Sequence, residues 1–373
     1  MAATMAASQR HATIEHPGQV ITTTRALDGL RGVAMLTVVA YQLGAPGLPG
    51  GWIGVEILFV TFGFLLGREL LDPRDGGLTR LLVRRIVTSA AVLLPVVVAG
   101  LAYAYADAGR LDRPVVAAAV AVLAQCYNLV LDRATVDHAV FGNLWIVSIL
   151  AQFTVLAVVA ARWFSVVGRR YTTVLLLMLV GEISVVRVVW LGMGGHADSV
   201  YLSSWFRFDG LLLGLAAAAI AGVLRRAEAD WFGPFATAGL GVLVGAVVLL
   251  PGFGEWDGPS ATVVMPVVTV AAFLVVVALG SGTAPVALAR LLELAPLRWI
   301  GAAWASILVW SRLVALVLGG GADGWAVWGG WGRLGILLGA SVAVGLVAHE
   351  LVVSPVAERL ADRPSPAASL TRQ

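Results

Sequence analysis

The chain has 373 residues, of which 59% are hydrophobic and 13% are charged, and its mean hydropathy is +0.90. A composition this apolar excludes a water-soluble domain and predicts an integral membrane protein. The net charge is +3, and because no basic stripe runs along the sequence, a nucleic-acid-binding function is not indicated.

Cysteine and histidine give no sign of a disulfide or a metal site. The single cysteine, Cys126, lies in an apolar segment, so no intrachain disulfide and no cysteine cluster can form. The five histidines are His11, His16, His138, His196 and His349. No two of them have the spacing of paired metal ligands, and we expect no metal site.

The two ends of the chain differ from the apolar middle. Residues 1–20 are rich in Ala, Ser and Thr and contain no apolar core, so no cleavable signal peptide is predicted there. We expect disordered tails at 1–20 and 357–373 and one membrane domain at 21–356.

Eleven apolar stretches are long enough to cross about 30 Å of hydrocarbon. They lie near residues 32–46, 52–67, 86–106, 115–132, 144–161, 172–193, 208–224, 233–251, 261–280, 299–319 and 331–353. The predicted fold class is therefore all-α, a polytopic bundle of about 10–11 transmembrane helices.

Arginine-rich loops should mark the cytoplasmic side of the membrane. Three candidate spans separate Arg85 from Arg162, and an odd number of crossings would put these two arginine clusters on opposite sides. Either one candidate between residues 86 and 161 does not cross fully, or one cluster faces outward.

Polar and ionisable side chains stand at or inside the first two apolar stretches, where they are costly and usually functional. Arg31 and Gln42 are eleven residues apart. At about 100° and 1.5 Å per residue, this spacing returns to within roughly 20° of one helix face, some 16 Å deeper. Both side chains would then face one cavity. The alternative is that Arg25 and Arg31 only anchor the first helix on its cytoplasmic side.

Two runs in this region resemble signatures of the acyltransferase 3 family of polytopic membrane proteins. They are Arg-Ala-Leu-Asp-Gly-Leu-Arg-Gly from Arg25 and Gly-Gly-Trp-Ile-Gly-Val-Glu ending at Glu56, and the similarity continues to about Pro355. Members of the family transfer acyl groups, often acetyl from cytoplasmic acetyl-CoA, to sugars and other acceptors. The resemblance implies ten spans with both termini cytoplasmic in a plasma membrane, specifically a bacterial inner membrane.

Side chains at the positions of the family's motifs are expected to bind the donor or the acceptor. They are Asp28, Arg31, Arg84, Arg85, Trp145, Gln152, Arg207, Trp310 and Ser311. Arg31 and Arg85 would hold the phosphates of acyl-CoA, a co-substrate rather than a bound cofactor. The alternative for Arg84 and Arg85 is a role in fixing topology. Arg207 and Asp209 would bind the acceptor between them or form a structural ion pair.

Four positions depart from the proton-handling residues of the family. The family has a histidine at the position of Gln42, two glutamates at Leu150 and Ala151, and a second histidine at Ser311. Glutamine can orient a hydroxyl group but cannot take its proton at neutral pH. Loss of a general base typically costs about 10²–10⁴ in rate.

Proton handling is therefore expected at a relocated site, on Glu56 or Asp209, while Gln42 orients the acceptor. The alternative role of Glu56 is to neutralise Arg31 or Arg207 in the membrane. His349 is a further candidate for a replacement, or forms an interfacial pair with its neighbour in sequence.

Two functions remain open. The first is a membrane-embedded acyltransferase that moves an acyl group, expected to be acetyl, from acyl-CoA to a hydroxyl of a sugar, lipid or secondary metabolite. The second is a catalytically inactive relative that acts as a ligand-binding, transport or accessory membrane protein. The transferase requires Gln42 and Glu56 to face a shared passage through the lipid bilayer.

Overall fold

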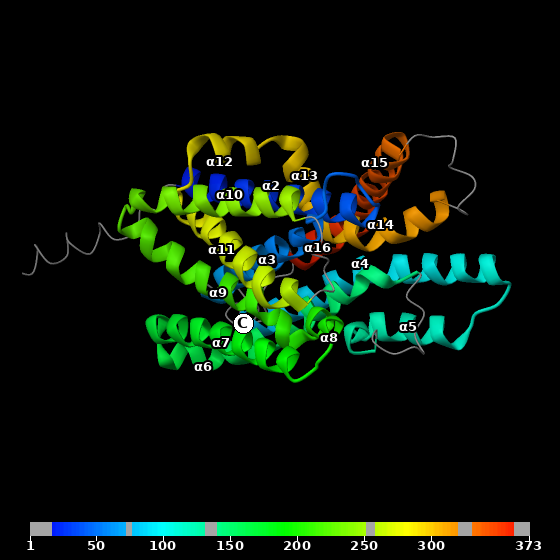
Figure 1. Cartoon of the computed structure of the whole chain (residues 1–373), viewed down its shortest axis with the longest axis horizontal. Coiled ribbons are helices and arrows are strands. Elements are labelled where there is room, and N and C mark those ends of the chain that lie inside the picture. The colour runs from blue at the N-terminus through cyan, green and yellow to red at the C-terminus, as the bar shows by residue number, and fades with distance from the viewer. Residues whose placement is uncertain (1–16, 72–76, 131–139, 251–257, 320–329, 362–373) are drawn as a thin grey trace, which may run out of the picture.

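A computed structural model of the chain describes residues 17–71, 77–130, 140–250, 258–319 and 330–361. Every regular element in these ranges is helical, which confirms the predicted all-α fold class. Most of the helices lie roughly along the long axis of the molecule or cross it obliquely (Figure 1).

Seven described segments are long and apolar enough to span a membrane. They contain α4 (Gly77–Ala108), α6 (Trp145–Val167), α7 (Arg169–Gly192), α9 (Ser204–Arg226), α10 (Gly233–Leu249), α11 (Met265–Ser281) and α15 (Gly330–Ala348). Helices α13 (Ala295–Ala302) and α14 (Trp304–Gly319) pass the same test as a pair, with a bend of 77° between them. The polytopic helical bundle is thus confirmed.

Two helices at the centre of the bundle, α2 (Pro17–Gln42) and α3 (Gly54–Leu71), are outside this group of seven. Both carry charged side chains, including Arg31 on α2 and Glu56 on α3, which lower their hydropathy. Helix α3 is nevertheless buried along most of its length, and the ribbon shows it inside the bundle (Figure 1). Its charges therefore face protein rather than lipid.

The helix in the stretch 115–132 is too short to cross the bilayer. Helix α5 (Arg113–Leu123) has 11 residues and is followed by a turn and the short helix η3 (Tyr127–Leu129). At about 1.5 Å per residue it covers roughly half of the hydrocarbon thickness. Among the described residues between Arg85 and Arg162, α4 and α6 alone are long enough to cross, and two crossings would put both arginine clusters on one side.

Glycines in the Arg25–Gly32 motif permit a very close helix crossing. An added Cβ on Gly29 would lie 1.7 Å from the carbonyl oxygen of Leu292, at the end of α12 (Val286–Leu292). A Cβ on Gly301 of α13 would lie 1.6 Å from the carbonyl oxygen of Asp28. The glycines of the Arg25–Gly32 motif therefore allow α12 and α13 to pack directly against α2. This structural role is independent of any role of the motif in ligand binding.

A second glycine crossing joins α3 and α9. A Cβ on Gly63 would lie 2.2 Å from the oxygen of Leu211, and one on Gly214 would lie 2.3 Å from the oxygen of Val60. Glu56 and Arg207 stand seven residues, or two turns, before these two glycines on helices that run in the same direction. The crossing therefore brings the two charged side chains to the same level.

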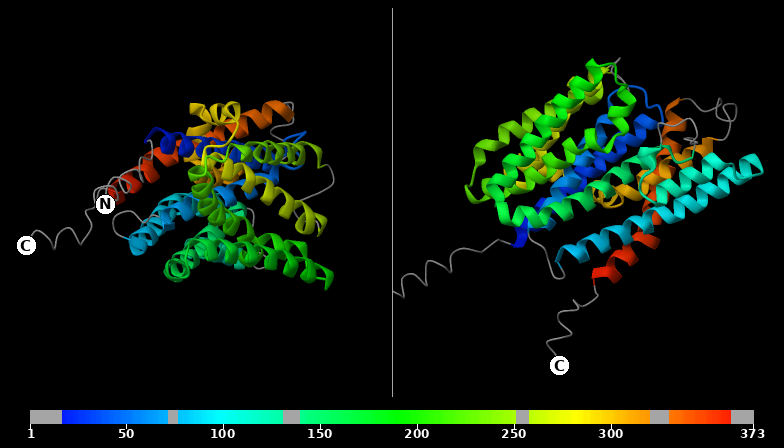
Figure 2. Two further views of the ribbon diagram at one scale, coloured as in Figure 1. Left: turned by 90° about the vertical axis from the view of Figure 1, so that its left-hand side faces the viewer. Right: turned by 90° about the horizontal axis from the view of Figure 1, so that it is seen from below.

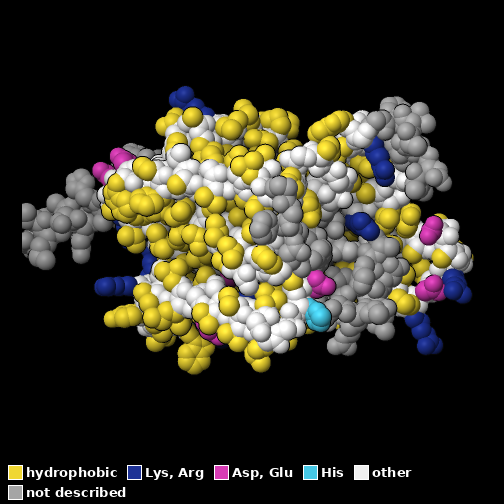
Figure 3. All heavy atoms as spheres, viewed as in Figure 1, with side chains coloured by type: hydrophobic (Ala, Val, Ile, Leu, Met, Phe, Trp, Pro, Cys, Tyr) yellow, Lys and Arg dark blue, Asp and Glu magenta, His cyan; other side chains and the backbone are white. Residues whose placement is uncertain are grey.

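The surface of the bundle is largely apolar. Hydrophobic side chains cover the middle of the face in Figure 3, and most of the charged side chains visible there lie toward its two ends. The last described segment runs from α15 through the π-helical turn η7 (His349–Val353) into α16 (Ser354–Ala361). Helix α16 lies beside α4 (Figure 2), where Arg80 donates a hydrogen bond to the carbonyl oxygen of Leu360 at 3.2 Å.

Parts of both predicted tails are helical, because α2 begins at Pro17 and α16 ends at Ala361. The rest of both tails lies outside the described residues.

Candidate functional site

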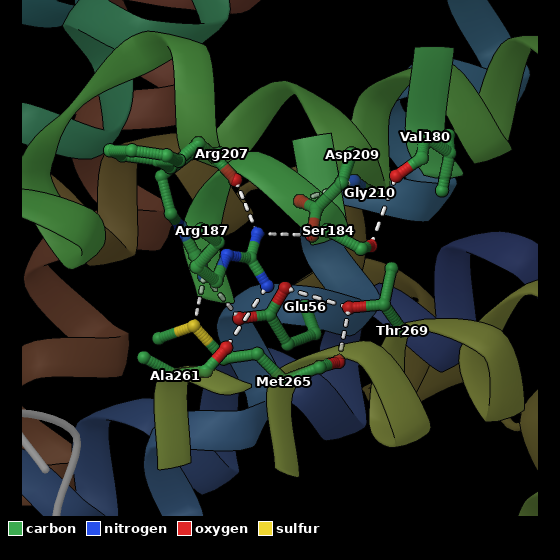
Figure 4. Close-up of polar contacts among 11 residues, drawn as sticks. Glu56, Val180, Ser184, Arg187, Arg207, Asp209, Gly210, Ala261, Met265 and Thr269 are labelled. Carbon is green, nitrogen blue, oxygen red and sulfur yellow. Dashed lines mark hydrogen bonds and ion pairs between the residues drawn. The ribbon is translucent and has the colours of Figure 1, made fainter. Parts of the chain in front are cut away.

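A fully buried ion pair joins α3 to α9 (Figure 4). Arg207 Nη1 donates to Glu56 Oε1 at 2.5 Å, and neither side chain has any solvent exposure. Thr269 Oγ1 donates to the other carboxylate oxygen at 3.2 Å. Of the two arginines considered as neutralising partners of Glu56, the structure places Arg207 against it and Arg31 elsewhere.

Three aromatic rings surround the guanidinium group of Arg207. Its central carbon lies 4.9 Å from the ring centroid of Phe59, 5.0 Å from that of Tyr201 and 5.9 Å from that of Trp145. A desolvated cation–π contact is worth about 2 kcal/mol. Trp145, which the sequence assigned to substrate binding, is placed here as a wall of this buried cage.

A second buried ion pair joins α7 to α9. Arg187 Nη2 lies 2.5 Å from Asp209 Oδ2 and also donates to the carbonyl oxygen of Phe206 at 2.5 Å, while Nη1 donates to that of Ala261 at 3.2 Å (Figure 4). Sequence reasoning missed Arg187, although an arginine inside the apolar stretch 172–193 was signal enough. Asp209 is thus held by Arg187 rather than by Arg207.

Gln42 and Ser311 stand at the two positions where members of the family have histidines, and both are hydrogen-bonded to the same third residue. Asn143 Nδ2 donates to Gln42 Oε1 at 2.9 Å and to Ser311 Oγ at 3.3 Å. Asn143 lies in η4 (Gly142–Leu144), directly before α6, and the sequence analysis missed it. A polar residue next to the start of an apolar run was its only signal. We call Gln42, Asn143 and Ser311 the amide–hydroxyl cluster.

A cavity of about 220 Å³ lies between α2, α3, α4, α6, α14 and η7. It brings together Arg31 and Arg85, the two residues assigned to the donor, although they are far apart in sequence. Leu150 and Ala151, at the positions of the family's glutamates, form part of its wall. His349 also lines it, at the start of a π-helical turn of the kind often found at functional sites.

This cavity is not the passage that Gln42 and Glu56 were expected to share, because neither residue lines it. Of Arg31, Gln42, Glu56, Arg207 and Asp209, this cavity is lined by Arg31 alone. The reason is that Glu56, Arg207 and Asp209 are enclosed at the crossings of α9 with α3 and α7, where packing leaves at most 2% of each residue exposed.

Positive charge predominates at the α4 side of the cavity. Arg84 and Arg85 share one carboxylate, that of Glu69, at 2.9 and 3.0 Å, and the ring of Phe62 lies 5.3 Å from the Arg85 guanidinium carbon. Arg31 pairs with Asp28 on its own helix. Because two arginines share one partner, an anionic ligand could be held here by Arg85.

The amide–hydroxyl cluster lies beyond the cavity along two helices. Ser306 lines the cavity and Ser311 belongs to the cluster, five residues further along α14. Val147 lines the cavity and Asn143 precedes it by four residues. These offsets correspond to roughly 6–8 Å. A molecule that fills the cavity could therefore present its end close to the cluster.

Gln152, also assigned to substrate binding, is placed in a buried hydrogen-bond network. Its amide donates to Asn128 Oδ1 and to the carbonyl oxygen of Gln125, both at 2.9 Å, and its Oε1 accepts from Ser204. Asn128 in turn donates to Ser204 Oγ at 2.8 Å and to the oxygen of Leu202 at 3.1 Å. The network anchors the turn after α5 to α6 and α9.

The last sequence-assigned residue, Trp310, is half-buried and packs against the core. Within the described ranges, no three His, Cys, Asp or Glu side chains gather in a way that could hold a metal ion.

Comparison with known proteins identifies what the chain is similar to. The model of the acyltransferase domain family, acyltransferase 3, matches residues 24–350. No solved structure matches the chain.

The curated relatives are bacterial proteins. A predicted O-acetyltransferase of Staphylococcus aureus (strain COL) is 26% identical over 201 residues, which are 51% of this chain and 33% of that protein. The peptidoglycan O-acetyltransferase of Listeria monocytogenes serovar 1/2a is 35% identical over 79 residues, 19% of this chain and 13% of that protein. The matched region thus spans a third or less of the length of these relatives.

Proposed function

Because the chain belongs to the acyltransferase 3 family, we propose that it moves an acyl group from acyl-CoA to a hydroxyl acceptor in the membrane. The acceptor is a sugar, lipid or secondary-metabolite hydroxyl, and the membrane is a bacterial inner membrane with both termini in the cytoplasm. The named O-acetyltransferase relatives support transfer to oxygen.

The observation that carries the proposal is the cavity that joins Arg31 to Arg85. Arginine binds phosphate through charge-assisted and often bidentate hydrogen bonds. The Nε atoms of both arginines are buried and make no hydrogen bond in the structure. In the proposal, these cations hold the phosphates of the donor at the arginine-rich, cytoplasmic side while the thioester end enters the cavity.

The amide–hydroxyl cluster is the proposed acceptor site. The acceptor oxygen attacks the thioester carbon, the carbon–sulfur bond breaks, and the hydroxyl proton ends on the CoA thiol, so the products are an ester and free CoA. Gln42 Oε1 and Ser311 Oγ can accept a hydrogen bond from the attacking hydroxyl once it displaces Asn143. They orient the oxygen, and the roles of Glu56 and Asp209 in proton transfer remain predictions.

The second candidate, an inactive relative that binds the same ligands, is favoured by one observation. The cluster of Gln42, Asn143 and Ser311 contains no group that titrates near neutral pH. The double variant Gln42→His with Leu150→Glu restores two of the family's proton-handling groups. If the parent transfers no acyl group and this variant gains transfer, the inactive relative is the correct reading.

The test is transfer of radiolabelled acyl groups from CoA by membranes that contain the full chain. Arg85→Gln leaves Glu69 paired with Arg84, so the protein should still fold. Loss of a charge-assisted hydrogen bond of about 1.5–3 kcal/mol should raise the KM for acyl-CoA by about tenfold or more. Arg170→Gln, at an exposed position on α7, is the matched control. An unchanged KM in Arg85→Gln would contradict the donor site.

A further inference from the structure

The cavity has an opening that faces the side of the bundle. Ile86 on α4 and Val155 on α6 both line it and are 48% and 45% exposed. Their neighbours Val83 on α4 and Leu156 and Val159 on α6 are also exposed. In a span these large apolar side chains face the hydrocarbon of the bilayer, so the gap between α4 and α6 opens toward lipid.

The wall that α3 and α6 form toward this opening is apolar, whereas α4 adds Arg85, Thr88 and Ser89 to the lining. Phe62, Val147, Leu150 and Ala151 line the cavity between the helices that form it. Thr154, on the same wall, donates its hydroxyl hydrogen to the carbonyl oxygen of Leu150 at 2.8 Å and offers no free donor. A wall of this kind stabilises hydrocarbon and would leave a polar group without partners.

Polar groups without partners lie on α2, α4 and α14, and the Nε of Arg85 on α4 is one of them. Ser306 on α14 is 1% exposed, lines the cavity, and its Oγ makes no hydrogen bond in the structure. The Nε of Arg31 on α2 is also buried and unbonded. Near α4, Gln125 instead donates its amide hydrogen to Ser89 Oγ at 3.0 Å. The cavity is therefore amphipathic: its polar groups lie on α2, α14 and, at Arg85, on α4, and its apolar arm is the wall of α3 and α6 that ends at the opening beside Ile86 and Val155.

We propose that the acyl group of the donor is longer than acetyl, a chain of several carbons that occupies the apolar arm and points into the opening between α4 and α6. This inference rests on the proposed function. The thioester lies at the polar end beside Ser306, while Arg31 holds the phosphates, and the opening lets the chain end extend toward lipid. The two glutamate positions of the family are apolar here, which suits a hydrocarbon occupant.

The first experiment measures donor binding without an acceptor. The full chain in lipid nanodiscs is loaded with tritiated acetyl-CoA, which is displaced by unlabelled acetyl-, butanoyl-, hexanoyl- and octanoyl-CoA, and empty nanodiscs correct for partition into lipid. Each methylene moved out of water improves affinity by up to about fourfold, so octanoyl-CoA should bind at least tenfold more tightly than acetyl-CoA. Equal affinities, as expected if only the pantetheine arm of CoA fills the cavity, would overturn the inference.

The second experiment fills the arm. Ala151→Phe should abolish the affinity advantage of octanoyl-CoA over acetyl-CoA, and Ala151→Leu gives a milder version should the larger side chain prevent folding. Val159→Phe, on the lipid face of the same helix, is the matched control and should keep the wild-type chain-length profile. A profile that survives in both Ala151 variants would contradict the assignment.

The outcomes distinguish failure of the long-chain inference from failure of the proposed acyltransferase function. If acetyl-CoA binds and is transferred but longer chains gain nothing, the inference fails and the proposed function stands. If no acyl-CoA of any length shows saturable binding, both fail.

Discussion

Removing the charge of Glu56 should destabilise the protein strongly, because the variant Glu56→Gln leaves Arg207 without a counter-charge. The guanidinium is fully buried among Phe59, Tyr201 and Trp145, and no described acidic side chain other than Glu56 forms an ion pair with it. Its Nε and Nη2 already lack hydrogen-bond partners, and Met265 Sδ, which accepts from Nη1 at 3.4 Å, supplies no counter-charge.

The size of the effect follows from the geometry. Breaking a buried pair by removing one partner costs about 3–5 kcal/mol, since the remaining ion has been taken out of water. Removing both charges, as in Glu56→Gln with Arg207→Met, is often neutral or stabilising. We therefore expect the double variant to recover most of the stability lost in the single variant.

The assay is an SDS titration of the purified protein in mixed micelles, followed by the loss of helical circular dichroism. Glu228→Gln, at an exposed position after α9, is the matched control and should leave the unfolding midpoint unchanged. Wild-type stability in Glu56→Gln, or a double variant no more stable than the single one, would refute the reasoning. If the double variant folds and still transfers acyl groups, Glu56 is not the proton-handling residue.

Three further predictions concern the amide–hydroxyl cluster, a helix crossing and the network after α5. Gln42→Ala should lower kcat/KM for transfer by roughly tenfold through the loss of a hydrogen bond to the attacking hydroxyl while the unfolding midpoint stays at the wild-type value; full activity would contradict a role for the cluster. Gly214→Ala should destabilise by about 1–3 kcal/mol or more, because its Cβ meets the backbone of α3, whereas Gly241→Ala, which meets open space on α10, should be neutral or stabilising in the same titration. Asn128→Ala leaves buried partners unsatisfied and should cost about 1–3 kcal/mol; an unchanged midpoint would show that the network does not hold the turn.

Much of the fold can be predicted from the lengths of the apolar stretches in the sequence. A long apolar stretch in lipid satisfies its backbone N–H and C=O groups by forming a helix. The stretch 115–132 departs from this rule. The helix ends before Gln125, whose carbonyl oxygen accepts from Gln152, and the side chain of Asn128 fixes the following turn through Gln152 and Ser204. The sequence indicated that one candidate between 86 and 161 fails to cross, and these tertiary partners decide which.

The site was harder to predict, since its geometry depends on which helices touch. Spacing along one helix places Arg31 and Gln42 near one face, yet their difference in depth puts Arg31 in the cavity and Gln42 in the cluster beyond it. Glu56 pairs with Arg207 because the glycine crossing of α3 and α9 places these two side chains together. The sequence of α3 alone does not distinguish Arg207 from Arg31 as the partner. Asn143 is identified as a site residue only by its hydrogen bonds to Gln42 on α2 and to Ser311 on α14, which the sequence does not show.

The most direct measurement is photoaffinity labelling of the full chain in nanodiscs with an acyl-CoA that carries a diazirine near the end of its acyl chain, followed by mass spectrometry of the labelled peptides. The account predicts labels on the cavity-lining parts of α4 and α6, around Ile86 and Ala151, that excess unlabelled acyl-CoA removes. Labels confined to the exposed faces of α7 or α10, or labels that competition leaves in place, would contradict it.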